Sequence, residues 1–506
     1  MPGFVGRTSE LSTLDRHLAW VRDGRGDQRG RALLLRGRRR VGKSRLVDLF
    51  CERAQVPYVV HQATRGEDAH RERARFLDEV RHSSLPDTAL LTGVTTVAEW
   101  DTALRQLAAV LPDDAPSVVV LDELPWMLEG DPVLEGTLQT VWDRVLSRKP
   151  VLLILIGSDL AMMEQLSAYG RPFHQRGLEM VLAPLSPAEV MAMTGLPAAD
   201  AFDAHLITGG LPLICQEWQE GESRTGFLSR ALDDPTSPLL VSAERALAAE
   251  FPTALQARHV LSVIGSGERT FGTIAARAGS ADRPLPPGSL NPALRTLADK
   301  RLIAIDTPLS TRPGDRDRRY RVADPYLRFW LAFLEEGIPE IERGRSRIVV
   351  EAVERGWTSW RGRAIEPVVR ESLARLLPDG TWPQVREVGG WWPRTNNPEV
   401  DLVGADRSPA REIGFVGSIK WHESGPFDRR ALTTLVRDAL AVPGADEDTP
   451  LVAVSRTGFT VDGLAATYGP ERLMEGWGGR RVSCRSRALA GLRNHREADA
   501  SRVRPA

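Results

Sequence analysis

Short apolar segments alternate with amphipathic ones through the first 186 residues of the chain. The apolar runs cover residues 32–35, 56–62, 118–121, 151–157 and 181–187. The stretches between them carry apolar residues at helical spacing. Strands that are apolar throughout are typical of parallel sheets, because helices cover both faces of such sheets. The pattern therefore predicts an α/β domain with a parallel sheet over residues 1–186.

Four further segments follow along the chain. Residues 187–250 are mostly helical and predict a lid-type subdomain. Residues 251–324 predict three short helices and two strands, the order of a winged helix-turn-helix. A long helical stretch and then several strands predict a second α/β domain over 325–484. The tail 485–506 is polar, and we expect it to lack stable structure.

The turn after the first apolar strand carries the pattern G-x-x-x-x-G-K-S, and an amphipathic helix follows it. Glycine lets the backbone approach an anion, and N–H groups of the turn and the helix N-terminus then point at phosphate oxygens. Lys43 is expected to bind the outer phosphates, and Ser44 to ligate Mg²⁺. The sequence thus predicts a P-loop NTPase fold. The predicted binding residues are Gly37, Arg38, Arg39, Arg40, Val41, Gly42, Lys43, Ser44 and Arg45.

Two acidic residues, Asp122 and Glu123, follow the apolar run 118–121. Ligands of open α/β sheets bind at the carboxyl edge, where this run ends. Asp122 is therefore predicted to hold Mg²⁺, and Glu123 to orient or deprotonate the attacking water. Ser158 ends the next apolar strand, where it could contact the γ-phosphate or the water. A hydrogen bond within its own loop is the alternative for Ser158.

Two arginines, Arg171 and Arg176, lie between the strand that ends at Ser158 and the last predicted strand. An arginine that contacts the γ-phosphate stabilises the charge of the transition state. Arg176 is the candidate for this catalytic role, together with Lys43 and Glu123. A solvated surface position is the alternative for both arginines.

Composition narrows the class of protein. A chain of 506 residues is too long for one core, and 42% hydrophobic and 26% charged residues are ordinary for a globular protein. A net charge of −1 means that any DNA site must be a local patch. Three cysteines without paired spacing argue against a disulfide framework or a zinc site. We expect a cytoplasmic protein without a membrane partner, because no signal peptide or long apolar run is evident.

These motifs together resemble the archaeal-type P-loop ATPases of the AAA+-related STAND group of nucleotide switches. The residues that carry the resemblance are FVGR at 4–7, GRRRVGKS at 37–44, VVVLDE at 118–123, LIGS at 155–158, the segment around Arg176 and ITGGLPL at 207–213. The resemblance implies ATP as ligand with Mg²⁺ as cofactor. It also implies that Val5, Gly6 and Arg7 lie near the adenine, and that Arg176 serves the phosphates.

From residue 319 the chain resembles the C-terminal domain of unknown function that is often fused to these ATPases. That domain is similar to the restriction-endonuclease-like PD-(D/E)xK fold, which implies Glu366 and Asp401 as metal ligands and Lys420 as their partner. The position two before Lys420 should be acidic but is Ser418, so one ligand is missing. Glu399 shares the strand face of Asp401 and could compensate. A degenerate nuclease fold kept for binding or packing is the preferred interpretation.

DNA is a candidate partner through arginines and a lysine of the winged-helix segment. These residues are Arg295, Lys300, Arg301, Arg316, Arg318, Arg319 and Arg321. Interleaved aspartates weaken that case, and an internal packing role for the segment is the alternative.

Three functions remain open from the sequence. The first hypothesis is a Mg²⁺-dependent ATPase that acts as a regulatory switch, with DNA, a second copy of the chain or another protein as its partner. The first alternative is an ATP-dependent nuclease of a defence or mobile-element system. The second alternative is a nucleotide-binding signalling scaffold with little turnover.

Overall fold

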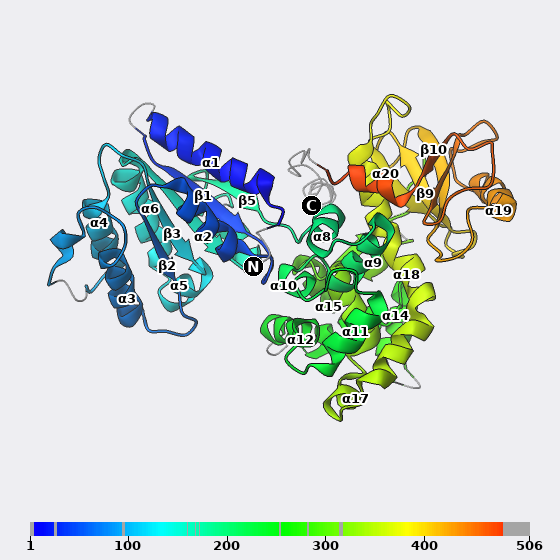
Figure 1. Cartoon of the computed structure of the whole chain (residues 1–506), viewed down its shortest axis with the longest axis horizontal. Coiled ribbons are helices and arrows are strands. Elements are labelled where there is room, and N and C mark those ends of the chain that lie inside the picture. Colours follow the sequence, from blue (N-terminus) through cyan, green and yellow to red (C-terminus); the bar gives the residue numbers. More distant parts are fainter. Residues whose placement is uncertain are drawn as a thin grey trace, which may run out of the picture.

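The computed structural model shows two lobes joined after strand β5 (Figure 1). It describes residues 5–24, 28–93, 97–158, 160–166, 168–171, 173–251, 255–280, 283–312 and 317–478. The predicted polar tail 485–506 and Arg316 lie outside these residues. Among the helices described, none combines the length and the apolarity that crossing a bilayer requires.

A five-stranded sheet forms the centre of the first lobe. Its strands run in the order β2-β3-β4-β1-β5, and every neighbouring pair is parallel. Their bounds are β1 Arg31–Arg36, β2 Tyr58–Gln62, β3 Ser117–Asp122, β4 Val151–Gly157 and β5 Gly177–Val181. All residues of β3 and β4 are buried, as expected of strands covered on both faces. The predicted parallel sheet of a P-loop NTPase fold is confirmed.

Helices cover both faces of this sheet (Figure 1). Leu33 and Leu35 of β1 pack into the core with α1 and α2, whereas Leu34 packs on the opposite side with α3 to α6. Alternate side chains of one strand thus serve two cores. The helices are α1 Thr8–Asp23, α2 Lys43–Ala54, α3 Ala69–Arg81, α4 Trp100–Val110, α5 Leu124–Gly130, α6 Leu134–Arg144 and α7 Leu160–Leu166.

One predicted strand is wrong in its bounds. The sequence favoured 181–187 as the last strand, but β5 begins at Gly177 and ends at Val181. Leu182 still donates its N–H to the carbonyl of Arg36 at 2.7 Å. Pro184 and Pro187 then offer no N–H for further pairing, so the chain leaves the sheet.

A buried histidine connects β2 to α3. His61 has no exposed surface, and its Nε2 lies 2.8 Å from Glu72 Oε1, while its Nδ1 contacts Glu79. Burial alone would lower the pKa of His61, but the two glutamates outweigh burial and raise it above 6.5. Burial likewise opposes ionisation of Glu72, yet His61 and Arg75 lower its pKa to about 2.

The His61–Glu72 pair makes stability depend on pH. The contribution of His61 is present below pH 6.5 and is lost as pH rises through its raised pKa. The contribution of Glu72 is present above 4.5 and is lost as pH falls toward 2. We therefore expect His61→Gln to lower the free energy of unfolding by about 1.5–3 kcal/mol near pH 5–6, where its effect is largest. The Tm should fall most in the same pH range. Thermal unfolding from pH 5 to 9 measures this, with the exposed His82→Gln as control. A constant difference in Tm across that range would contradict the prediction.

The second lobe begins with helices and a two-stranded sheet. The helices before the sheet are α8 Pro187–Thr194, α9 Ala198–Thr208, α10 Pro212–Cys215, α11 Arg224–Asp233, α12 Pro238–Glu250, α13 Leu255–Gly265, α14 Phe271–Ala278 and α15 Pro287–Asp299. Strands β6 (Ile303–Asp306) and β7 (Arg319–Val322) pair antiparallel. The order of α13 to β7 is the three-helix, two-strand order expected for 251–324.

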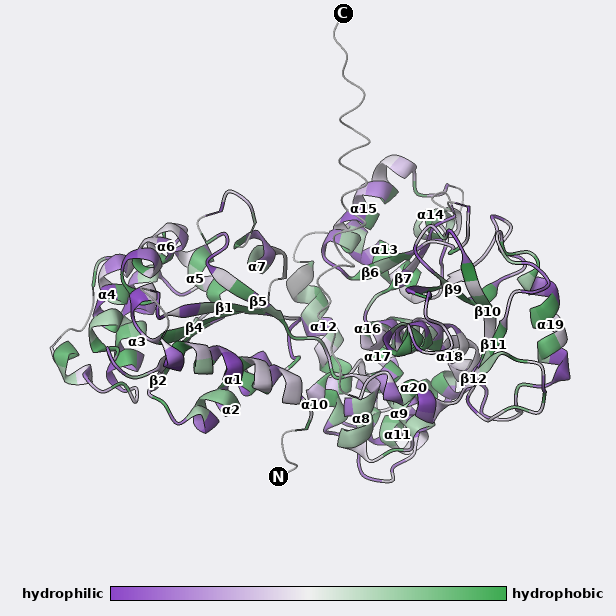
Figure 2. Cartoon of the chain, turned by 90° about the horizontal axis from the view of Figure 1, so that it is seen from above, coloured by the Kyte–Doolittle hydropathy of each residue, from purple (hydrophilic) through white to green (hydrophobic). Residues whose placement is uncertain are grey.

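A second sheet of five strands closes the lobe, in the order β12-β11-β10-β9-β8. Strand β9 is antiparallel to β8 and β10, whereas β10, β11 and β12 are parallel, so this sheet is mixed. Much of β4, β5, β10 and β11 is coloured as hydrophobic in Figure 2. The elements are α16 Pro325–Phe329, η3 Trp330–Leu334, α17 Ile338–Glu342, α18 Ser346–Leu376, β8 Glu387–Trp391, β9 Val400–Ala405, β10 Ile413–Lys420, α19 Arg429–Ala439, β11 Leu451–Ser455, β12 Ala466–Tyr468 and α20 Pro470–Glu475.

A buried carboxylate connects the helices of the second lobe to its sheet. Asp203 of α9 accepts hydrogen bonds from Arg361 of α18 at 2.9 Å and from Arg456 at 3.1 Å. The indole Nε1 of Trp421 donates to its other oxygen at 3.2 Å. Because a buried charge is stable only when it is paired and hydrogen-bonded, these contacts fix α9 against the mixed sheet.

Candidate nucleotide-binding site

The glycine-rich turn lies at the carboxyl edge of the parallel sheet, between β1 and α2. Two of its glycines are required by their surroundings. Gly42 has a φ of 88°, and a Cβ on Gly37 would lie 2.5 Å from the carbonyl oxygen of Leu182. The turn therefore holds its shape only with glycine at these two positions.

Lys43 lies inside the turn and is only 6% exposed. Its Nζ donates to the carbonyl oxygens of Gly37 at 2.8 Å and Arg38 at 3.1 Å. Burial lowers the pKa of Lys43, and the charges of Glu123 and Asp122 partly offset this effect. The ammonium group is thus held at the place where the outer phosphates of a nucleotide are expected.

Ser44 and Asp122 meet at the same edge. The Ser44 hydroxyl donates to Asp122 Oδ2 at 2.6 Å, although the two residues are 78 positions apart. Hydroxyl and carboxylate oxygens are the donors that Mg²⁺ prefers. Within the described ranges, no three His, Cys, Asp or Glu side chains gather as a metal site. A Mg²⁺ here would take most of its ligands from water and phosphate oxygens.

Glu123 follows in a left-handed conformation, with a φ of 53°. This conformation is uncommon for a residue with a side chain and occurs often at functional sites. The Ser158 hydroxyl donates to both carboxylate oxygens of Glu123, at 2.9 and 3.2 Å. Ser158 thus holds the carboxylate of Glu123, which neither interpretation of its sequence position anticipated.

The segment Val5–Gly6–Arg7 reaches the turn through Arg7. Arg7 is buried, donates from Nη2 to the carbonyl oxygen of Val41 at 3.0 Å and pairs with Glu10 at 3.3 Å. A Cβ on Gly6 would lie 2.7 Å from Glu189 Oε1 of α8. Arg7 therefore stabilises the turn through its hydrogen bond to the carbonyl group of Val41.

Arg176 does not join these residues. It precedes β5, whose Gly177 lies opposite Ala32 near the start of β1, so it sits at the amino edge of the sheet. The turn lies at the other edge, about 16 Å away at ~3.3 Å per strand residue. Arg176 Nε instead contacts Asp143 Oδ1 at 2.8 Å. The prediction that Arg176 contacts the γ-phosphate does not agree with this arrangement within one chain.

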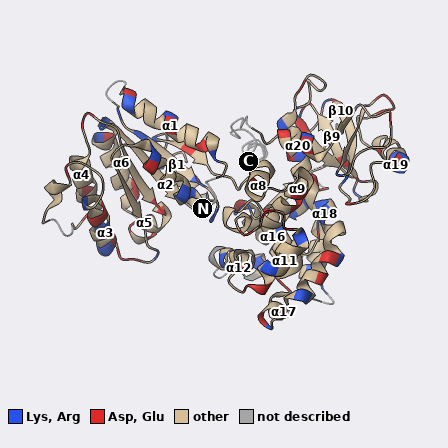
Figure 3. Cartoon of the chain, viewed as in Figure 1, with Lys and Arg blue, Asp and Glu red and all other residues tan. Residues whose placement is uncertain are grey.

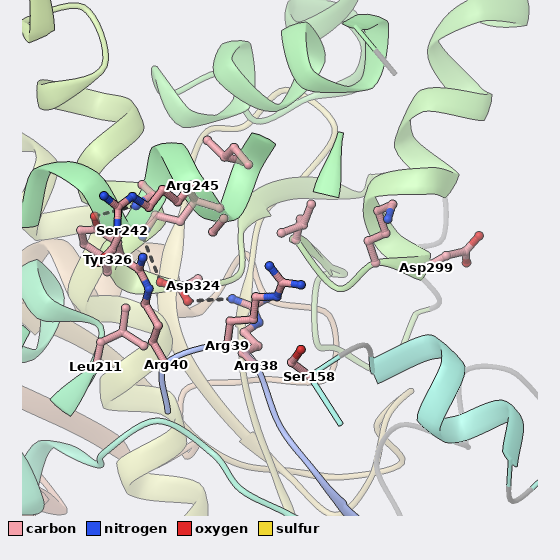
Figure 4. A pocket seen from close by; sticks show the side chains of 16 residues that line it. Arg38, Arg39, Arg40, Ser158, Leu211, Ser242, Arg245, Asp299, Asp324 and Tyr326 are labelled. Atoms are coloured by element: carbon pink, nitrogen blue, oxygen red, sulfur yellow. Dashed lines mark hydrogen bonds and ion pairs between the residues drawn. The ribbon is translucent and has the colours of Figure 1, made fainter. Parts of the chain in front are cut away.

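The three arginines of the turn line a cavity of about 230 Å³, and Arg38 and Arg40 contact the second lobe there (Figure 4). Arg38 Nη1 pairs with Asp324 Oδ2 at 2.7 Å, and Arg38 Nη2 donates to the carbonyl of Arg301. Arg40 donates to Ser242 of α12. We call the Arg38–Asp324 pair and the Arg40–Ser242 bond the interlobe contact.

The predicted nuclease-like residues also lie close to one another in the mixed sheet. Asp401 Oδ2 accepts hydrogen bonds from the Ser418 hydroxyl at 2.9 Å and from the N–H of Ile419 at 2.8 Å. Glu366 of α18 is nearby, and burial raises its pKa to about 7. Arg370 donates to Glu366 at 3.0 Å and to the carbonyl of Asp401 at 2.8 Å. A guanidinium therefore already contacts the two residues that were predicted to bind a metal.

Glu399 does not compensate for the carboxylate missing at Ser418. It pairs with Arg269 at 3.3 Å and with Arg319, so both of its oxygens are engaged. Lys420 ends β10 two residues after Ser418 and shares its strand face. The second carboxylate of a two-metal site is thus lacking here, as the sequence indicated.

Comparison with known proteins finds a family model that matches part of the second lobe. Residues 330–432 match the family model DUF234, described as archaea bacterial proteins of unknown function. This segment is therefore similar to DUF234 proteins, and the match covers no other part of the chain. An uncharacterized protein of Methanocaldococcus jannaschii is 21% identical over 432 residues, which cover 83% of this chain and 88% of that protein.

Solved structures of archaeal ATPases are similar to the chain at low identity. The Walker-type ATPase of Pyrococcus abyssi is 17% identical, with a TM-score of 0.48 over 65% of this chain and 96% of that one. The Aeropyrum pernix ORC2 protein is 14% identical, with a TM-score of 0.41 over 70% and 96%. A STAND protein with a tetratricopeptide repeat sensor from Pyrococcus horikoshii is 14% identical, with a TM-score of 0.28 over 76% and 55%.

Most of the basic residues proposed to meet DNA are engaged elsewhere. Arg301 contacts Glu164 of the first lobe, and Lys300 lines the cavity beside the glycine-rich turn. Arg319 is buried against Asn396 and Glu399, and Arg321 pairs with Asp306 at 2.8 Å. Basic and acidic residues are interspersed along the helices of both lobes (Figure 3).

Proposed function

We propose that the protein is a Mg²⁺-dependent ATPase that acts as a nucleotide-controlled switch. The observation that carries this proposal is the meeting of Lys43, Ser44, Asp122 and Glu123 at one edge of the parallel sheet. The Ser44–Asp122 distance of 2.6 Å brings the two predicted ligands of Mg²⁺ together. The DUF234 match and the similarity to archaeal ATPases are consistent with it but name no reaction for this chain.

Each of these four residues would have its own role in phosphoryl transfer. Lys43 would exchange the carbonyls of Gly37 and Arg38 for phosphate oxygens, because a charged acceptor is the stronger partner. Glu123 would accept a proton from the attacking water while Ser158 holds its carboxylate. Mg²⁺, when bound by Ser44 and Asp122, would neutralise charge on the phosphates.

The proposed organisation has a P-loop ATPase domain at 1–186, a helical lid-type subdomain at 187–250, a winged helix-turn-helix at 251–324 and a restriction-endonuclease-like domain at 325–484. DNA is a candidate partner, with Arg295, Arg316 and Arg318 as its candidate contacts. Arg176 would serve a phosphate only from a second copy of the chain, since it lies at the far edge of its own sheet.

The test of the proposal is phosphate release from ATP by the whole chain, with and without Mg²⁺. Saturable ATP binding and Mg²⁺-dependent release would support it. A chain that binds no ATP would overturn it, and one that binds ATP without release would favour the scaffold. Plasmid cleavage that is lost in Asp401→Ala would favour the nuclease instead.

The interlobe contact is the part of the molecule that would transmit the nucleotide state. Arg38 and Arg40 belong to the turn that binds phosphates, and both already contact the second lobe. A nucleotide that draws Arg38 toward its phosphates would take it away from Asp324. Nucleotide binding and docking of the lobes would then compete for the same guanidinium.

Asp324→Asn is expected to open the lobes. The change removes the charge of the ion pair, yet its side-chain oxygen can still accept the N–H of Leu327, which caps α16 at 2.9 Å. Loss of about 1 kcal/mol predicts a roughly fivefold larger open population. Energy transfer between dyes on α4 and α19 in single molecules measures this population.

Arg39→Gln is the matched control for that experiment. Arg39 belongs to the same turn, but its guanidinium lies 5.8 Å from the ring centre of Trp126 in its own lobe. MgATP should increase the open population of the wild type but change that of Asp324→Asn little. Equal populations in wild type and Asp324→Asn would show that the ion pair does not hold the lobes.

A further inference from the structure

A small cavity of about 30 Å³ lies between the β6–β7 sheet and helices α16 and α18. Arginines dominate its lining. They are Arg269, Arg319, Arg321, Arg328, Arg363 and Arg370, which we call the arginine cavity. Only Asp306 and Glu366 are acidic among its lining residues. The volume corresponds to about two water positions.

Four of these arginines already have acidic partners. Arg321 pairs with Asp306 at 2.8 Å, and Arg370 pairs with Glu366 at 3.0 Å. Arg269 and Arg319 share Glu399. Three carboxylates thus serve four arginines, so one positive charge among them has no carboxylate of its own.

The side chains of the other two, Arg328 and Arg363, make no hydrogen bond or ion pair among the residues that the structure describes. Burial, together with the charges of Arg321 and Arg363, lowers the pKa of Arg328 to about 10, although Glu366 and Asp306 act in the opposite direction. Arg363 extends from α18 to within 4.0 Å of the position that a Cβ on Gly267 would occupy. The half-buried side chain of Arg328 and the exposed side chain of Arg363 therefore line the same cavity, and burying an unpaired guanidinium such as that of Arg328 is costly unless an anion joins it.

We propose that the arginine cavity binds a phosphate group of a small ligand, with Arg328 and Arg363 as its main contacts. Guanidinium groups bind phosphate in a bidentate manner, and two of them match its double charge. The cavity is too small and too enclosed for the backbone of a DNA duplex, which needs arginines at an open surface. Two openings of about 230 and 290 Å³ share Arg321 with the cavity and leave room for the rest of the ligand.

This site is separate from the proposed ATP site. Its residues come from α16, α18 and β7, whereas the glycine-rich turn lies in the first lobe. The proposal also changes the sign of the charge expected on a ligand in this region. Glu366 was expected to attract a metal cation, but the excess of guanidinium groups around it favours an anion.

The test uses the full chain with Lys43→Ala, so that the P-loop contributes little to phosphate binding. Calorimetry with inorganic phosphate and with pyrophosphate, at ionic strength matched by NaCl, measures affinity. AMP in a second arm distinguishes a nucleotide from free phosphate. We expect saturable binding of at least one of these probes, and at least a tenfold loss of that binding in Arg363→Met and in Arg328→Met.

Arg347→Met is the control, because Arg347 lies on the same helix α18 but is 90% exposed and pairs with Glu351. Its affinity should equal that of the parent. Arg363 is exposed, so its variant keeps the test valid if Arg328→Met does not fold. Absence of binding for every probe, or equal affinity in Arg363→Met and its parent, would overturn the proposal without touching the ATPase.

Discussion

Lys43→Ala is expected to weaken ATP binding by between about tenfold and a hundredfold. The ammonium group makes charge-assisted hydrogen bonds to phosphates, each worth about 1.5–3 kcal/mol. In the free protein it bonds two carbonyls of its own turn, and the change removes only those bonds from the folded state. Titration of the purified chain with MgATP, followed by calorimetry, gives the ratio of the two affinities.

Lys149→Ala is the matched control for this change. Lys149 lies in the same lobe and also donates to a backbone carbonyl, that of Leu111 at 3.1 Å. It lies before β4, at the edge of the sheet away from the turn. We expect it to leave ATP affinity unchanged. Equal affinity of the wild type and Lys43→Ala would remove the basis for a nucleotide site at this turn.

Glu123→Gln is expected to reduce ATP turnover by about a hundredfold to ten-thousandfold while ATP still binds. A positioned general base contributes this much to the rate, and glutamine cannot accept the proton. Glutamine keeps the size of the side chain and an oxygen that can accept the Ser158 hydroxyl. Phosphate release at saturating MgATP measures turnover, and calorimetry measures binding.

Glu129→Gln serves as the control, since Glu129 is an exposed carboxylate on the adjoining helix α5. Its turnover should match that of the wild type. If Glu123→Gln and the wild type release phosphate at the same measurable rate, the water is activated by another group. If neither releases phosphate although both bind ATP, the signalling scaffold becomes the better hypothesis.

The sequence predicted those parts of the site that depend on local pattern and strand direction. Gly37 to Ser44 form a contiguous motif, and Asp122 ends a parallel strand, so both had to reach the same sheet edge. In both cases one short-range rule was sufficient. The proximity of Asp401 and Ser418 was instead implied by the resemblance to the PD-(D/E)xK fold.

Contacts between distant segments could not be predicted in this way. Arg38 and Asp324 are 286 positions apart, and no periodicity links them. Arg176 was assigned from its order along the chain, but the pairing of β5 with β1 decides which edge it occupies. The short strand β12 was also missed, because three residues carry too little pattern.

Asp324 uses its two oxygens for different purposes. Oδ1 begins helix α16, and Oδ2 holds Arg38 of the first lobe. Separation of the lobes would therefore cost only the second bond and leave the helix start intact. Helix α16 has Asp324 at its start and Arg328 in its last turn. A ligand in the arginine cavity and the Arg38–Asp324 ion pair would therefore act on the same short helix. The two lobes could then separate and dock again repeatedly while helix α16 stays folded.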